Sequence, residues 1–321
     1  MAYQVGGTNR IEDNNTVAFK NVTVKNHYVF KTSNGYGTAT GYASGGTPTT
    51  DVIQKFPFSS DNNSTDVGNL TASRGSAAGQ SSSDNGYTSG GSPPFFDTID
   101  KFPFSSDANA TDVGNMIQAK VGVFGQSSLD NGYVSGGSDP GFTRSNVIEK
   151  FPFSTDGNAT DVGDLTQARN NAAGQSSTDN GYSSGGNGPP TVNTIDKFPF
   201  STDANATDVG DLTTATLSGV GQSSNTNGYI SGGRYLPPST LTNTIEKFPF
   251  STDANASDVG DLTESKYGAA GQSSTSNGYT SGGSAPAASN KIEKFPFSSD
   301  ANASDIADLL GALYNAAGQQ V

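Results

Sequence analysis

The chain has 321 residues, 41 of them glycine, with 31% hydrophobic residues and a formal net charge of −13 at pH 7. This charge repels the phosphates of nucleic acids and anionic lipids, so nucleic-acid partners are not expected. The chain contains no cysteine, which excludes disulfides, thiolate catalysis and cysteine-ligated zinc. Glycine and small polar residues favour short strands joined by tight turns over helices.

Residues 1–36 precede the repeated part of the chain and are expected to form a separate attachment segment. Hydrophobic and polar residues alternate from Val17 to Val24, which predicts a short β-hairpin. The segment has no basic stretch followed by an apolar one, and no apolar run in the chain approaches the roughly 20 residues of a membrane helix. We therefore expect synthesis in the cytoplasm without a signal peptide, and no membrane insertion. The residues expected to make the attachment are Tyr3, Val5, Ile11, Val17 and Phe19.

Three phrases recur six times along the rest of the chain. KFPF begins at Lys55, Lys101, Lys150, Lys197, Lys247 and Lys294. GYxSGG begins at Gly41, Gly86, Gly132, Gly181, Gly228 and Gly278. A GQ pair ends at Gln80, Gln126, Gln175, Gln222, Gln272 and Gln319. The shared spacing indicates a repeat architecture.

One repeat contains four short strands, AAGQSS, NGYSSGG, NTIDKFPF and ATDVGDLT, between residues 172 and 213. Asn180-Gly181 lies between the first two and suits a tight hairpin turn. Asp203-Ala204-Asn205 lies between the last two, and such side chains bond to nearby backbone. A four-stranded unit cannot bury both faces alone, so copies must stack around an axis. The sequence therefore predicts an all-β protein with a six-bladed β-propeller over residues 37–321.

The two ends of the repeated region complement each other. The first repeat begins at residue 37 with no GQ strand before its GYxSGG phrase, whereas the chain ends on a GQ strand with no GYxSGG phrase after it. We predict that the C-terminal strand completes the first blade, which leaves no sheet edge open between blades.

The strands also differ in where they can lie within a blade. Small residues such as Ala172, Ala173 and Gly174 suit the crowded innermost strand. We expect the neighbouring glutamines and serines to line a wet central channel. The proline of Phe-Pro-Phe lacks a donor, which suits an outer or bulged position.

Antiparallel blades place their connections alternately on two faces of the disk. The turns between strands one and two and between strands three and four are nearly identical in every repeat, whereas the other loops vary. Aromatic and arginine side chains on loops of a rigid scaffold often bind partners, although they also pack against blade edges. The residues expected to bind a protein or glycan are Phe95, Phe96, Phe142, Arg144, Arg234, Tyr235, Leu236 and Tyr267. Loops that lead into the next blade add Arg74, Lys120, Arg169 and Lys266.

The sequence offers little for catalysis, so no enzyme activity and no cofactor are expected. Its single histidine is His27, outside the repeats, which leaves histidine and cysteine schemes without partners. No metal site is expected either. A calcium alternative exists at Asp156, Asn158, Thr160 and Asp161, whose oxygens alternate as in the start of a calcium loop, but the later bidentate glutamate is missing. The competing interpretation is a turn held by its own side chains.

The repeats resemble kelch repeats. The resemblance rests on the double glycine Gly185-Gly186, the third strand Ile195-Asp196-Lys197-Phe198 and Arg169 before the next blade. It implies four-stranded blades. The usual kelch tryptophan is missing, since the chain has none, and Val209 with Leu212 takes its place.

Two phrases resemble virion proteins of marine bacteriophages, particularly those infecting cyanobacteria. One is the opening from Tyr3 to Thr8, and the other is KFPFSSDANATDVG, which begins at Lys101. The resemblance implies a structural virion protein, a tail fibre, capsid decoration or host adhesin, anchored to other virion proteins by its N-terminal segment. The propeller would then face a host surface protein or glycan. The alternatives are a cellular kelch-like interaction scaffold and a glycan-active propeller enzyme.

Overall fold

The computed structural model describes residues 39–321 apart from residue 238. The chain divides into two compact units, residues 1–32 and 33–321, and every described residue belongs to the second. The predicted N-terminal hairpin and the attachment residues therefore lie outside the described residues. Those residues are Tyr3, Val5, Ile11, Val17 and Phe19.

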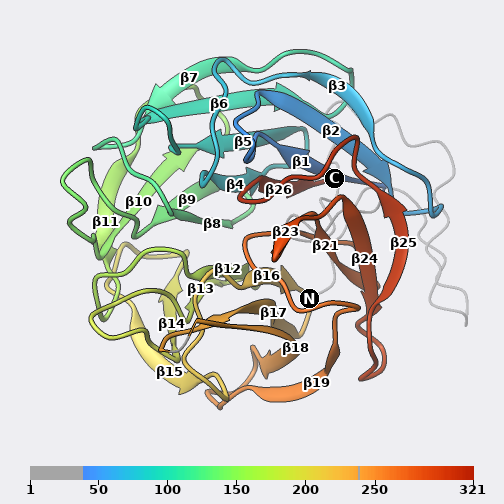
Figure 1. The fold of residues 1–321 in the computed structure, drawn as a ribbon. Helices are drawn as coiled ribbons and strands as arrows, with labels where there is room; N and C mark the ends of the chain where they lie inside the picture. The colour runs from blue at the N-terminus through green and yellow to red at the C-terminus, as the bar shows by residue number, and fades with distance from the viewer. Residues whose placement is uncertain (1–38, 238) are drawn as a thin grey trace, which may run out of the picture. The chain divides into compact units, whose positions relative to one another are not determined.

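The described residues form six four-stranded antiparallel sheets arranged as blades around a central axis (Figure 1). The predicted six-bladed β-propeller is confirmed. From the centre outward, blade 1 contains β26 (Ala317–Gln320), β1 (Thr40–Ser44), β2 (Val52–Pro57) and β3 (Thr65–Asn69). Blade 2 contains β4 (Ala78–Ser81), β5 (Asn85–Ser89), β6 (Thr98–Pro103) and β7 (Thr111–Asn115). Blade 3 contains β8 (Phe124–Ser127), β9 (Asn131–Ser135), β10 (Val147–Pro152) and β11 (Thr160–Asp164).

The remaining blades follow the same order. Blade 4 contains β12 (Ala173–Ser176), β13 (Asn180–Ser184), β14 (Thr194–Pro199) and β15 (Thr207–Asp211). Blade 5 contains β16 (Val220–Ser223), β17 (Asn227–Tyr235), β18 (Thr240–Pro249) and β19 (Ser257–Asp261). Blade 6 contains β20 (Ala270–Ser273), β21 (Asn277–Ser281), β24 (Lys291–Pro296) and β25 (Ser304–Asp308). A small hairpin, β22 (Ser284–Ala285) and β23 (Ala287–Ala288), lies in its second loop.

The C-terminal strand closes the ring, as predicted. β26 pairs antiparallel with β1, from Gly41 opposite Gln320 to Ser44 opposite Ala317. Beyond the strand end, the backbone N–H of Val321 donates to the carbonyl of Thr40, and the N–H of Thr40 donates back. The last residues of the chain thus supply the innermost strand of the first blade.

The proline of Phe-Pro-Phe ends the third strand of each blade. In blade 3, Pro152 lies opposite Asn131 at the last pair of the ladder. The β-bulge lies elsewhere, between Ile148 and Glu149 on the side of the outermost strand. At the end of a strand, as in an outer strand, the N–H that proline lacks is not needed for a ladder hydrogen bond.

The innermost strands meet at six glycines that form the neck of the central channel. A Cβ added to any of them would lie 2.1–2.3 Å from a backbone carbonyl oxygen of the preceding glycine in the ring. These glycines are Gly79, Gly125, Gly174, Gly221, Gly271 and Gly318. Only a residue without a side chain allows six backbones to approach this closely.

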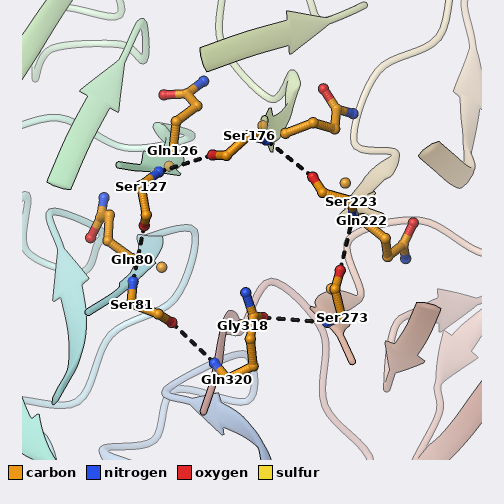
Figure 2. A pocket seen from close by; sticks show the side chains of 16 residues that line it. Gln80, Ser81, Gln126, Ser127, Ser176, Gln222, Ser223, Ser273, Gly318 and Gln320 are labelled. Carbon is orange, nitrogen blue, oxygen red and sulfur yellow. Dashed lines mark hydrogen bonds between the residues drawn. The ribbon is translucent and has the colours of Figure 1, made fainter. Parts of the chain in front are cut away.

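Two closed circles of hydrogen bonds lie on either side of this neck. In the first circle, the backbone N–H of one residue per innermost strand donates to the side chain of the corresponding residue in the next blade, at 3.0 Å in five cases and 3.4 Å in the sixth (Figure 2). The residues of this circle are Ser81, Ser127, Ser176, Ser223, Ser273 and Gln320. On the other side, six left-handed residues donate N–H to carbonyl around the ring at 2.5–2.9 Å. These are Ser76, Gly122, Asn171, Ser218, Gly268 and Asn315.

The glutamines of the GQ pairs do not extend freely into the channel. Gln80 is 1% exposed, because its amide donates to the carbonyl of Tyr133 in the next blade and accepts from Ser89 in its own. Each of the other five glutamines also donates to the carbonyl of the corresponding tyrosine in the next blade. The expected glutamines and serines therefore do line one end of the channel, but the glutamine amide groups are buried and join adjacent blades.

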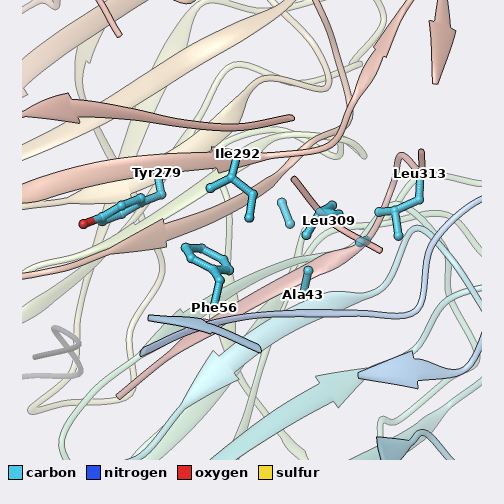
Figure 3. Packing of buried hydrophobic residues seen from close by; sticks show 8 residues of the cluster. Ala43, Phe56, Tyr279, Ile292, Leu309 and Leu313 are labelled. Atoms are coloured by element: carbon cyan, nitrogen blue, oxygen red, sulfur yellow. The ribbon is translucent and has the colours of Figure 1, made fainter. Parts of the chain in front are cut away.

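Aromatic rings fill the space between blades. The tyrosine of each second strand lies against the second phenylalanine of the next blade's Phe-Pro-Phe, with ring centroids 4.5–4.9 Å apart. Burial raises the pKa of Tyr87 to about 12. At the seam between blades 6 and 1, Phe56 and Tyr279 pack with Ile292, Leu309 and Leu313 (Figure 3). The KFPF and GY phrases thus recur because they build the interfaces between blades.

The turn between the third and fourth strands fastens each blade to the one before it. Asp253 pairs with Lys197 at 2.5 Å, and the side-chain oxygen of Asn255 accepts the backbone N–H of Asp211 at 3.1 Å. Both contacts occur at all six interfaces. Each exposed ion pair contributes at most about 1 kcal/mol to the free energy of unfolding. The turn recurs in every repeat because each of the six interfaces between blades uses it.

Candidate functional site

Two sets of loops lie together on one face of the ring, which we call the variable face. One set joins the second and third strands, and the other leads from each outermost strand to the next blade. Backbone bridges join the two sets, as between Thr47 and Tyr314 and between Leu217 and Arg234. The opposite face, which we call the constant face, carries the conserved-length turns that fasten the blades. The sequence-predicted binding residues all belong to the variable face.

The predicted residues of blades 2 and 3 form one group. Phe142 is 75% exposed and has a left-handed backbone, with φ of 61°, which costs about 1–2 kcal/mol for a residue with a side chain. Its ring lies edge-to-face with that of Phe95, with centroids 6.0 Å apart. Phe96 instead lies under the guanidinium of Arg74 at 5.2 Å, and Arg144 is half-buried. Phe142 is therefore the most available side chain of this group.

The second group spans blades 5, 6 and 1. The guanidinium of Arg234 lies over the ring of Tyr267 at 4.9 Å, and Tyr267 meets Tyr314 edge-to-face at 6.0 Å. All three side chains are half-buried. We call these residues the aromatic row. Cation–π and edge-to-face contacts of this kind hold side chains in fixed positions at a surface.

Tyr314 was missed by the sequence analysis. It precedes the C-terminal strand, for which the sequence predicted ring closure alone. Its place in ALYNAAGQ matches that of Tyr267 in SKYGAAGQ, so alignment of the repeats would have found it. Tyr235 and Leu236 lie beside the row on the longer β17–β18 hairpin, where Tyr235 is paired with Thr240 and Leu236 is 41% exposed.

The cations expected on these loops are buried. The side chains of Arg74, Lys120, Arg169 and Lys266 are 0–2% exposed and form ion pairs with acids of the third strand in the same blade. The pairs are Arg74–Asp100, Lys120–Glu149, Arg169–Asp196 and Lys266–Glu293. The prediction that these cations contribute to a binding surface is therefore wrong, because their charges are buried and neutralised by ion pairs inside the blades.

Charge and side-chain length vary together at the two positions that form this buried ion pair. The longer arginine pairs with the shorter aspartate, and the shorter lysine pairs with the longer glutamate. Blade 1 has the uncharged Leu313 and Gln54 in the two places. Blade 5 keeps the acid, Glu246, but has Thr216 in place of the cation.

Glu246 is thus a buried carboxyl group in a blade that has Thr216 at the position where blades 2, 3, 4 and 6 have a cation. It is 4% exposed, and burial raises its pKa above the ordinary value of 4.5, with Asp258 adding to the shift. It is hydrogen-bonded to Thr213, whose backbone N–H donates at 2.8 Å and whose side chain also contributes. In blade 1 the amide of Gln54 makes the equivalent contact with the N–H of Leu310, also at 2.8 Å.

Replacing Glu246 by Gln is expected to stabilise the protein by about 1 kcal/mol at about pH 8, because it removes a buried unpaired charge and keeps the hydrogen bond. A raised folded-state pKa means that the acid form stabilises the fold below the unfolded pKa, and that this contribution is lost as pH rises through the folded pKa. The gain over the wild type should therefore shrink as pH falls toward about 4.5. Urea unfolding across this range measures it.

Glu293→Gln is the matched control, since it removes the buried partner of Lys266 and leaves only Glu264, 3.7 Å away. This variant should be destabilised at the same pH. Equal effects of the two substitutions would show that the missing cation in blade 5 has no energetic consequence.

The four residues of the calcium alternative all have partners within the protein. Asp156 pairs with Lys101, and Asn158 accepts the N–H of Asn115. Asp161 accepts the N–H of Gly163, while the hydroxyl of Thr160 donates to the carbonyl of Lys150. The turn is held by its own side chains and by the neighbouring blade. Across residues 39–321 without 238, no group of three or more His, Cys, Asp or Glu is arranged to hold a metal ion.

The hollows of the described ring differ in size and lining. The two ends of the central channel measure about 80 and 130 Å³, against roughly 300–1,000 Å³ for typical ligand pockets. A third hollow, of about 260 Å³, lies on the variable face at the seam between blades 6 and 1. The described part of the chain contains no helix of the length and apolarity that a membrane span requires.

Comparisons with known proteins add no family to this picture. No protein-family model matches the chain, and no curated protein matches it. The kelch and bacteriophage resemblances therefore stay predictions from the sequence, while the propeller itself is established by the fold.

Proposed function

We propose that the protein is a non-catalytic binding module that holds a protein or glycan partner on its variable face. The observation that carries this proposal is the aromatic row of Arg234, Tyr267 and Tyr314, which crosses three blades. Residues shared by all repeats make contacts within the ring, whereas these three are not shared. Aromatic and arginine side chains on a rigid support are typical of binding hot spots.

Phe142 supports the same proposal independently. An exposed phenylalanine in a left-handed conformation contributes little to stability and carries a backbone cost. Such strain is often found where a side chain is presented to a partner. The edge-to-face contact with Phe95 holds its ring at the surface.

Binding of the labelled full chain to an array of bacterial surface polysaccharides and immobilised envelope proteins tests the proposal. We expect saturable binding that falls at least about tenfold in the R234A/Y267A variant, since a hot-spot residue contributes roughly 2 kcal/mol or more. The control is K101A/K197A on the constant face, which should bind like the wild type. Equal loss in both variants, or no loss in either, would contradict the assignment of the face.

We further propose that this module is displayed on a bacteriophage particle and attached through residues 1–36. Support comes from the sequence resemblance alone. Mass spectrometry of purified particles, produced with the full chain or with residues 1–36 deleted, tests it. Incorporation of the full chain and its loss on deletion are expected. Unchanged incorporation would refute the attachment role, and capture of a bacterial protein without any incorporation would favour a cellular scaffold.

A further inference from the structure

The pocket at the seam between blades 6 and 1 exists because two features of the repeat are missing there. Leu313 stands where four other blades have a buried lysine or arginine, and Gln54 stands where they have the acid. Gly311 stands where blade 4 has Gln167 and blade 6 has Glu264. The lining residues are Pro48, Thr50, Val52, Gln54, Asp66, Leu310, Gly311, Ala312 and Leu313.

Larger side chains occupy the place of Gly311 in other blades. In blade 6, Glu264 accepts a hydrogen bond from Ser289 and pairs with Lys291. In blade 4, the amide of Gln167 lies within 3.0 Å of the position that a Cβ on Gly188 would take. At Gly311, an added Cβ would meet nothing within 4 Å. At this seam Gly311 therefore borders an opening of about 260 Å³, whereas blades 4 and 6 place the side chains of Gln167 and Glu264 at the equivalent position.

One charged residue, Asp66, is among the residues that line the pocket. In blades 2 and 4 the outermost strand carries Asp112 and Asp208, which act electrostatically on the buried Arg74 and Arg169. Asp66 has the same place in blade 1, directly opposite Gln54. It is exposed and lines the pocket. Blade 1 therefore has the carboxylate that lies near a buried cation in blades 2 and 4, but it has Leu313 in place of that cation.

The walls of the pocket are mostly aliphatic. Leu310 is 58% exposed, whereas Leu313 is 5% exposed at the back, and Val52 and Pro48 complete the apolar lining. A long side chain with an apolar stem and a cationic end matches such walls with a carboxylate among them. The net charge of −13 also favours a basic partner over an acidic one.

We propose that the seam pocket receives a lysine or arginine side chain from a partner protein, beside the place that Leu313 fills here and that the chain's own cations hold in blades 2, 3, 4 and 6. This inference rests on the proposed function, since the pocket opens on the variable face. The stem contacts Leu310, Leu313 and Val52, and the cationic group pairs with Asp66. Tyr314, at the end of the aromatic row, directly follows Leu313, so one partner can contact both features.

Titration of short capped peptides into the methyl-labelled full chain tests the proposal, with the methyl signals of Leu310 and Leu313 observed by NMR. Gly-Lys-Gly and Gly-Arg-Gly should shift these signals in a saturable manner. Gly-norleucine-Gly, with a similar stem and no charge, and Gly-Glu-Gly should not. Equal shifts with norleucine would reduce the site to an apolar hollow and overturn the proposal, as would the absence of any response to the basic peptides.

Two variants sharpen the experiment. Gly311→Gln, which copies blade 4, should abolish the response, whereas Gly157→Gln, at another glycine with open space around it, should not change it. Asp66→Asn should weaken peptide binding up to about fivefold, the effect of an exposed charge pair. Peptide binding that survives Gly311→Gln would place the peptide elsewhere and overturn the site.

The two proposals fail separately. Array binding that depends on the aromatic row, without a peptide response, would overturn the pocket and leave the proposed function intact. Peptide binding without any array binding would do the reverse. A response seen only after deletion of residues 1–36 would assign the pocket to that segment and overturn a partner protein as occupant.

Discussion

Replacing Asp196 by Asn is expected to lower the free energy of unfolding by about 3–5 kcal/mol, because it leaves a buried charge without its partner. Arg169 and Asp196 are both 0% exposed at their side chains. The guanidinium also donates to the carbonyls of Gly185 and Thr194, so it cannot turn outward without breaking further bonds. Urea unfolding at neutral pH measures the loss.

The sequence itself provides the control for this prediction. Blade 1 has Leu313 and Gln54 in the places of Arg169 and Asp196, so the double variant R169L/D196Q should recover much of the lost stability. Replacing a buried pair by an uncharged one is often neutral, unlike breaking it. Lys101→Met, which breaks an exposed pair, should cost at most about 1 kcal/mol. Equal losses in D196N and Lys101→Met would contradict the burial of the pair.

Replacing Gly174 by Ala is expected to cost on the order of 3 kcal/mol or to prevent folding, because the added methyl group has no space. Its Cβ would lie 2.1 Å from the carbonyl oxygen of Gly125. That oxygen belongs to a neighbouring innermost strand, so relief requires a shift of backbone around the neck. Thermal unfolding monitored by circular dichroism measures the loss, and size-exclusion chromatography detects failure to fold.

Gly157→Ala is the matched control for the neck. An added Cβ at Gly157 meets nothing within 4 Å, and this glycine lies in the turn that fastens blade 3 to blade 2. Its substitution should leave the unfolding midpoint nearly unchanged. Similar midpoints for the two variants would mean that the six innermost strands do not meet at their glycines.

The blade number and the ring closure could be predicted because both follow from local phrases. KFPF, GYxSGG and GQ recur with one period, and the isolated GQ strand at the C-terminus fits only the incomplete first blade. The role of the glutamines was not predictable in the same way. Gln80 is polar and lies on an innermost strand, but its bond to the carbonyl of Tyr133 depends on how two blades meet, which one repeat does not reveal.

The buried cations could have been recognised from the repeats. Arginine occurs with aspartate, lysine with glutamate and Leu313 with Gln54, a joint variation that indicates contact between the two positions. Position in a loop suggested exposure for Arg169, whereas the fold places it inside its blade. The aromatic row was only partly predictable for a related reason, since Arg234, Tyr267 and Tyr314 lie on three separate loops whose contacts depend on how neighbouring blades meet.

The distinction between the variable and constant faces depends on the closed ring, in which β26 pairs with β1. A pair of introduced cysteines tests this closure most directly. Thr40 and Val321 exchange two backbone hydrogen bonds, at 2.9 and 3.0 Å, and the chain has no cysteine of its own. A closed ring predicts that T40C/V321C forms an intramolecular disulfide on mild oxidation, giving a monomer of increased mobility on a non-reducing gel. The control N180C/V321C, with one cysteine at the equivalent position of blade 4, should not. Failure of T40C/V321C to cross-link, or cross-linking only between molecules, would contradict the closed six-bladed ring.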